Sequence, residues 1–106
     1  MGTLFYGAAG DVIRLEDRAL AHLKVVISTK LRRNESFMLS WQHPEGASTG
    51  RSTVWLHPSI PLRFEFDDVE APELSRQWIE ELAVAAQSTT GIVLVEEHVE
   101  PAPLPE

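Results

Sequence analysis

Cysteine is absent from all 106 residues of the sequence, which excludes disulfide bonds, thiol nucleophiles and cysteine-ligated metal sites. The sequence also lacks any apolar run of about 18 residues, the length that a membrane-spanning helix requires. Its first residues have neither the basic flank nor the long apolar core of a secretory signal, and Tyr6 stands where N-myristoylation at Gly2 requires Ser or Thr. We therefore expect a cytoplasmic protein without a membrane anchor.

Basic residues are scarce in the second half of the chain. The net charge is −7, and residues 64–106 contain one Lys or Arg against eleven Asp or Glu, whereas residues 1–63 contain eight against five. This asymmetry argues against nucleic-acid binding over the whole surface, because such binding favours a basic footprint. A local patch that contacts phosphates or an acidic partner is an alternative, and its candidate residues are Lys24, Lys30, Arg32 and Arg33.

Period-two alternation of apolar and polar side chains marks residues 37–42 and 62–67 as strands with one buried face. Between them, residues 52–57 are rich in the β-branched and aromatic side chains that strands favour. The connections between these segments are short and contain Gly or Pro, which predicts that neighbouring strands run antiparallel. We interpret residues 36–67 as a three-stranded antiparallel meander.

Outside the meander, the spacing of apolar residues predicts two helices and three further strands. Asp17 is expected to cap a first helix that begins at Arg18, and Asn34 is expected to end it in a left-handed conformation. Pro72 is expected in the first turn of the second helix. The further strands are predicted at residues 3–7, 12–16 and 92–96.

The resulting order, β-β-α-β-β-β-α-β, predicts an α+β fold in which one mainly antiparallel sheet carries two helices packed on one face. Residues 1–96 are interpreted as a single α+β domain. Residues 97–106 are acidic and rich in proline, so we expect them to form a flexible tail.

Two motifs suggest chemistry, but neither is complete. Residues 46–53 resemble a phosphate-binding loop, yet three residues rather than four separate its glycines, Arg51 replaces the lysine and no helix follows. A W-x-H-P pattern occurs twice and supplies His43 and His57, which a hairpin places far apart and without carboxylate or cysteine ligands at suitable spacing. We therefore predict no catalytic, cofactor-binding or metal-binding residues, and we favour a protein without enzymatic activity.

The sheet face turned away from the helices is the candidate interface. If the apolar residues of the first meander strand point toward the helices, Met38 points outward, and Trp55 and His57 of the next strand share its direction. An exposed Trp beside Met among polar residues resembles the core of a protein–protein interface. The pattern predicts a homodimer that associates through these three residues, with Phe5 or Tyr6 beside them. Burial of Trp55 inside the monomer is the alternative.

A resemblance to a known family covers residues 1–96 and is carried by residues 18–41, 50–68 and 76–92. The family consists of short uncharacterised bacterial proteins that are often labelled ATP-dependent DNA ligases. The label implies a lysine nucleophile in a K-x-D-G motif, but Lys24 precedes Val-Val-Ile and Lys30 precedes Leu-Arg-Arg, so this chain lacks the motif. We interpret the chain as a small non-enzymatic interaction module, with a DNA-associated accessory protein as the alternative.

Overall fold

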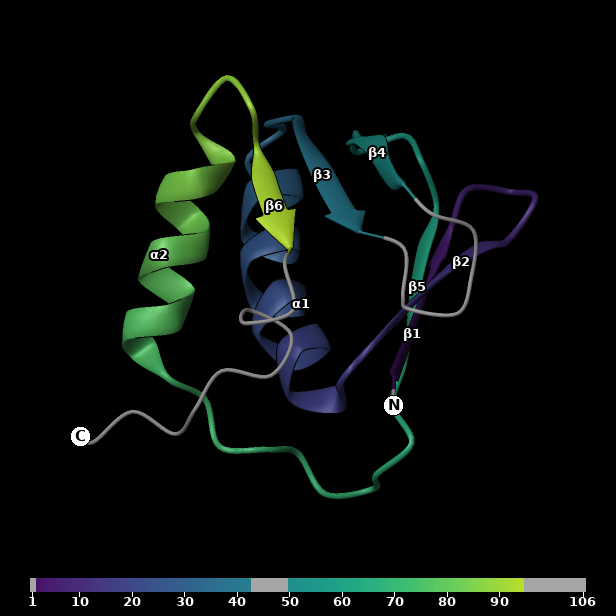
Figure 1. The fold of residues 1–106 in the computed structure, drawn as a ribbon, viewed down its shortest axis with the longest axis vertical. Coiled ribbons are helices and arrows are strands. Elements are labelled where there is room, and N and C mark those ends of the chain that lie inside the picture. The colour runs from purple at the N-terminus through teal and green to yellow at the C-terminus, as the bar shows by residue number, and fades with distance from the viewer. Residues whose placement is uncertain (1, 43–49, 95–106) are drawn as a thin grey trace.

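A computed structural model of the protein describes residues 2–42 and 50–94. Within them the elements follow the predicted order and form an α+β fold (Figure 1). Their bounds are Gly2–Tyr6 (β1), Asp11–Leu15 (β2), Asp17–Arg32 (α1), Phe37–Gln42 (β3), Arg51–Leu56 (β4), Leu62–Glu65 (β5), Arg76–Ala86 (α2) and Ile92–Leu94 (β6). His43, most of the loop after β3, the end of the last predicted strand and the predicted tail at residues 97–106 lie outside the described residues.

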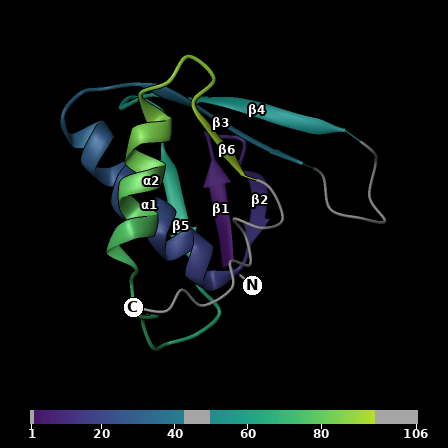
Figure 2. The same cartoon turned by 60° about the vertical axis from the view of Figure 1, so that its left-hand side comes forward.

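The strands form two three-stranded sheets, where the sequence suggested one. One sheet has the order β2-β1-β5 with antiparallel neighbours. The other has the order β4-β3-β6, in which β3 pairs antiparallel with β4 and parallel with β6. Figure 2 shows the two helices side by side, with β4 extending crosswise at the top of the molecule.

The pairing of β5 differs from the predicted meander. β5 lies beside β1, with Phe64 opposite Leu4, and not beside β4. The link after β4 begins with a tight turn, in which the N–H of Ile60 donates a hydrogen bond to the carbonyl of His57 at 2.9 Å. The two prolines of this link cannot donate hydrogen bonds to a strand ladder. The chain therefore leaves one sheet at the end of β4 and enters the other at β5.

The core lies where the helices meet the inner faces of the sheets. α1 contacts β1 and α2, and α2 also contacts β3 and β6. Buried apolar side chains come from both helices and both sheets, and those that are fully buried include Leu4, Leu20, Leu23, Leu39, Leu56 and Ile92. Because burying a side chain of this size stabilises a fold by about 1.5–3 kcal/mol, the apolar stripes determine how the elements are packed.

α1 begins one residue earlier than predicted, and Asp17 has a different role. The residue before the helix, Glu16, makes no side-chain capping hydrogen bond. The carboxylate of Asp17 accepts hydrogen bonds from the backbone N–H groups of Asp68 at 2.9 Å and Asp67 at 3.3 Å, and these bonds lower the pKa of Asp17. Asp17 thus ties the first turn of α1 to the segment after β5. The helix ends as predicted, because Asn34 has a φ of 63°.

α2 begins later than predicted, and Pro72 precedes it. Ser75 is the N-cap, and its hydroxyl accepts a hydrogen bond from the N–H of Trp78 at 3.2 Å. A serine hydroxyl can satisfy an N–H group that the first helical turn leaves unpaired, which proline cannot do. Trp78 and Leu82 of α2 are buried, whereas Leu74 lies before the helix and is exposed.

Candidate interaction surface

Seven side chains form the outer face of the β4-β3-β6 sheet, and they are Met38, Ser40, Gln42, Arg51, Thr53, Trp55 and Val93. The residues that alternate with them along the strands point into the core, where Leu39, Leu56 and Ile92 are completely buried. The alternation predicted for β3 and the direction predicted for Met38 and Trp55 are therefore confirmed.

The apolar members of the outer face lie toward one end of it. Trp55 and Met38 are directly opposite each other in the β3–β4 register, and 51% of the surface of Trp55 is exposed. Val93 of β6 is 44% exposed and pairs with Ser40. Among these seven described side chains Arg51 is the single charged one, and it lies at the start of β4, at the opposite end of the strand from Trp55. The face thus combines an uncharged apolar end with a polar end.

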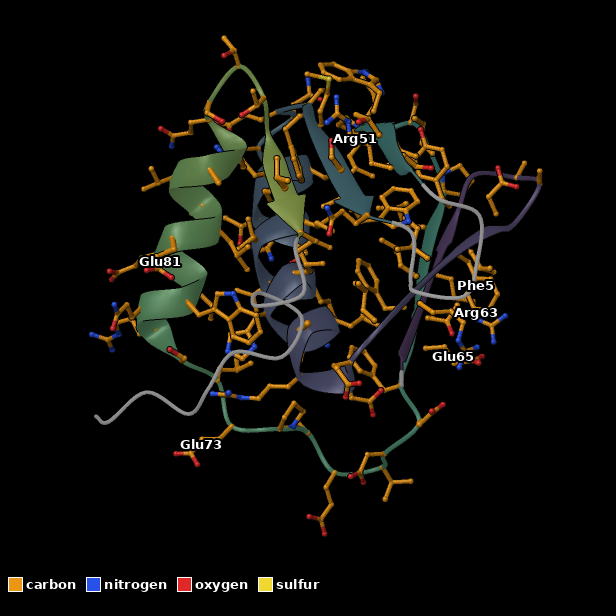
Figure 3. The ribbon with its side chains drawn as sticks, in the orientation of Figure 1. Phe5, Arg51, Arg63, Glu65, Glu73 and Glu81 are labelled. Carbon is orange, nitrogen blue, oxygen red and sulfur yellow. The ribbon has the colours of Figure 1, made fainter. Side chains whose placement is uncertain are left out.

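Hydrogen bonds hold the outer face in place. The hydroxyls of Ser40 and Thr53 lie 2.6 Å apart across the two strands. The hydroxyl of Tyr6 donates to the backbone carbonyl of Trp55 at 2.6 Å, which links the two sheets. Tyr6 therefore supports Trp55 from its backbone side. Phe5 belongs to the other sheet, where the guanidinium of Arg63 lies 5.0 Å from the centre of its ring (Figure 3).

His57 lies just beyond the end of β4, so it is not a member of the outer face. Its Nδ1 accepts a hydrogen bond from the backbone N–H of Ser59 at 3.0 Å and lies 2.8 Å from the Ser59 hydroxyl. The ring is exposed but is engaged by the turn that follows the strand. Within residues 2–42 and 50–94, no three His, Asp or Glu side chains gather in a way that could hold a metal ion.

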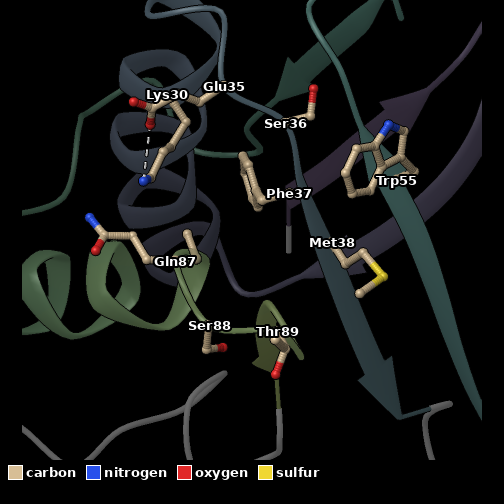
Figure 4. Close-up of a pocket in the computed structure, with 10 residues that line it drawn as sticks. Lys30, Glu35, Ser36, Phe37, Met38, Trp55, Gln87, Ser88 and Thr89 are labelled. Atoms are coloured by element: carbon tan, nitrogen blue, oxygen red, sulfur yellow. Dashed lines mark ion pairs between the residues drawn. The ribbon is translucent and has the colours of Figure 1, made fainter.

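An open pocket of about 440 Å³ adjoins the apolar end of the outer face (Figure 4). Met38 and Trp55 line one side, Lys30 and Glu35 line the other, and residues 86–89 at the end of α2 complete it. The loop from α2 can approach β3 closely because Gly91 has a φ of 73°, and a Cβ at this position would collide with the carbonyl of Met38. Sequence reasoning did not find this pocket, because its walls come from three distant segments.

The four basic residues proposed for anion contact are not gathered into one patch. Lys30 is buried, and its ammonium forms an ion pair with Glu35 at 3.1 Å. The ammonium of Lys24 lies 5.6 Å from the centre of the Phe66 ring. A helix turns about 100° per residue, so the basic side chains along α1 point in different directions. Exposed Arg32 and Arg33 are the neighbours that remain accessible at the end of the helix.

A buried histidine that sequence reasoning missed joins the two helices. His22 is completely buried, its Nδ1 lies 2.6 Å from the carbonyl of Arg18, and its Nε2 lies 2.7 Å from the backbone nitrogen of Ser75. Its ring also packs on Trp78, with 4.2 Å between the ring centres. Burial is the main cause that lowers the pKa of His22. The signal in the sequence was a histidine between apolar residues Ala21 and Leu23 of the predicted helix.

A comparison with protein-family models shows which family this chain belongs to. Residues 1–97 match the model of a family described as a domain of unknown function, DUF7882. The chain belongs to that family. The match confirms the resemblance to an uncharacterised family over all of residues 1–96, and it carries no information on ligase activity. No curated protein and no solved structure matches the chain. Neither helix in the described part of the chain is long and apolar enough to cross a membrane.

Proposed function

We propose that this member of the DUF7882 family is a small non-enzymatic interaction module that self-associates through the outer face of the β4-β3-β6 sheet. The observation that carries the proposal is the exposure of Trp55, 51%, directly beside Met38. Trp and Met are enriched in the cores of protein–protein interfaces, whereas charged residues are depleted there. The outer face has this composition, because Arg51 is its single charged member.

A two-fold dimer is the arrangement that this face supports best. In such a dimer both copies use the same surface, so the apolar residues of the outer face become buried in both copies at once. Trp55, Met38 and Val93 then form the centre. One of the Ser40 and Thr53 hydroxyls already donates to the other, so a single hydroxyl proton of this pair remains to be satisfied in the interface. Cytoplasmic residence is part of the proposal, and the absence of cysteine agrees with it.

Sedimentation velocity over a range of protein concentrations tests the proposal. The wild-type protein is expected to sediment as a dimer, and Trp55→Ala is expected to weaken association by about 2 kcal/mol or more. Val12→Ala is the matched control, because Val12 is 54% exposed on a strand of the other sheet. The Val12→Ala variant should associate as the wild type does. At a protein concentration of about 1 mM, an association free energy of only about 4 kcal/mol is sufficient to form dimers. The proposal is contradicted if the wild-type protein stays monomeric up to that concentration.

The alternative proposal, a DNA-associated accessory protein, has narrower support. It rests on Arg32 and Arg33, which are adjacent and exposed. Lys30 is poorly suited to a phosphate contact, because its ammonium is covered and already paired with Glu35. The two proposals differ in their response to salt, since phosphate contacts weaken steeply as salt rises and an apolar interface does not.

A further inference from the structure

The pocket beside Trp55 has walls of two kinds. Figure 4 shows Met38 and Trp55 on one side and the Lys30–Glu35 ion pair on the other, with residues 87–89 below them. Its volume of about 440 Å³ falls within the range of pockets that hold small molecules. The pocket therefore suits a ligand that has both apolar and charged surface.

The accessible charge of this pocket is negative. In the ion pair, the Glu35 side chain is 46% exposed and the Lys30 side chain is 11% exposed, so the carboxylate faces solvent while the ammonium is covered. α2 ends at the pocket and has no basic residue in its last turn, so its own side chains do not offset the negative end of its dipole. The protein's net charge of −7 acts in the same direction. Exposed Arg32 and Arg33 at the end of α1 act in the opposite direction, but they do not line the pocket, so the preference for a cation rests on the Glu35 carboxylate within it.

The exposed indole of Trp55 supplies a second attraction for a cation. The face of a tryptophan ring attracts a cation that lies within about 6 Å of its centre. The thioether of Met38, opposite Trp55 in the register, offers polarizable apolar surface to alkyl groups. We propose that the pocket binds an alkylated ammonium group, and that Trp55 and Glu35, which both line the pocket, supply the attraction. This binding does not depend on self-association. Because the proposed dimer interface and the pocket share Trp55 and Met38, the ligand and a second copy of the chain are expected to compete for these residues.

NMR titration of the isotope-labelled protein tests the proposal, with the Trp55 indole N–H signal assigned from Trp55→Phe. Choline is the probe, and dimethylbutanol, its neutral carbon analogue, is the matched control ligand. Choline is expected to shift the signals of Trp55, Ser88 and Thr89. These shifts should saturate with a Kd on the order of 1 mM. The neutral analogue should bind about fivefold more weakly or worse. Equal shifts by both ligands, or a preference for acetate over choline, overturn the proposal.

Variants separate the two attractions. Trp55→Leu and Glu35→Gln should each weaken choline binding about fivefold or more, and Glu35→Asp, which keeps the charge, should retain most of it. Glu81→Gln is the matched control, because Glu81 is an exposed glutamate on α2 that does not line the pocket (Figure 3). If Glu35→Gln and Glu81→Gln lose choline affinity equally, the effect comes from net charge alone, and the proposed site is wrong.

A second arm identifies the source of the group. A short peptide with a central trimethyl-lysine is titrated in the same way. Tighter binding of the peptide than of choline indicates that the natural ligand is a protein side chain. Tighter binding of choline indicates a free small molecule. Either result supports an ammonium site. A protein that binds choline yet sediments as a monomer supports this site while contradicting self-association. A protein that dimerises and does not bind choline, even at dilutions at which it is monomeric, supports self-association and overturns this site.

Discussion

The ring nitrogen Nε2 of His22 accepts a hydrogen bond from the backbone N–H of Ser75, with 2.7 Å between the two nitrogens. The other ring nitrogen, Nδ1, lies 2.6 Å from the carbonyl of Arg18, which can only accept, so Nδ1 carries the proton. His22 is therefore neutral and in one tautomer. A middle turn of α1 is joined by this ring to the residue that caps α2.

Stability is expected to fall as the solution becomes acidic, because of His22. Burial lowers the pKa of His22 in the folded protein below its usual value of 6.5, and a proton on Nε2 removes the acceptor for Ser75. The unfolded chain then binds more protons than the folded one, so this contribution is fully present above about pH 6.5 and is lost as the pH falls through the folded pKa. Denaturant unfolding at several values between about pH 7.5 and about pH 5 measures the decline.

Two variants isolate this contribution. His22→Gln is less stable at every pH but should show a flatter dependence on pH, because its side chain does not titrate. His57→Gln is the control, since His57 is exposed beside a turn, and it should keep the wild-type dependence. Working above about pH 5 keeps Asp17 ionised, because its pKa is lowered from 3.8. The assignment is wrong if His22→Gln and the wild type lose stability in parallel.

Ser75→Ala is expected to destabilise the protein by about 1 kcal/mol. The change removes the hydroxyl that accepts the N–H of Trp78 at the start of α2. Ser28→Ala is the control, because the Ser28 hydroxyl donates to the carbonyl of Val25 on the exposed side of α1, and it should change stability by less than about 0.5 kcal/mol. Urea unfolding measures both. Equal effects would show that Ser75 does not act as a cap.

Charge reversal at Arg32 and Arg33 tests the DNA-associated alternative. If the wild type binds a short labelled duplex at low salt, the double variant Arg32→Glu, Arg33→Glu should lower its affinity by at least tenfold, because two phosphate contacts are replaced by repulsion. Lys30→Gln should have little effect on binding, since the Lys30 ammonium is already paired with Glu35. Fluorescence anisotropy measures the affinity. Unchanged binding in the double variant would place the contact on another surface.

Covalent labelling by ATP is expected to fail. Neither Lys24 nor Lys30 stands in a K-x-D-G motif, and Lys30 is also buried beside Glu35. Incubation with labelled ATP and Mg²⁺, followed by denaturing electrophoresis, should leave the protein unlabelled. A lysine-linked adenylate would show that the ligase label describes an activity of this chain.

The sequence by itself determined the elements and the faces of the strands. Alternation along residues 37–42 predicts that Leu39 is buried and that Met38 points outward, and both directions hold. Helical spacing likewise predicts the buried side of α1, where Leu20, Leu23 and Ile27 lie. These features follow from the sequence because a strand repeats every two residues and a helix about every 3.6, so local spacing is sufficient.

The tertiary structure alone decided which elements meet. Phe64 lies opposite Leu4 in a sheet that brings β5 to β1, although β4 is much nearer in sequence. Lys30, Glu35 and Trp55 line one pocket, and His22 bonds to Ser75, which lies 53 residues further along the chain. Local spacing shows which side of an element is apolar but not which partner covers it. That choice depends on how all the apolar faces are buried at once, and this is a property of the whole packed chain.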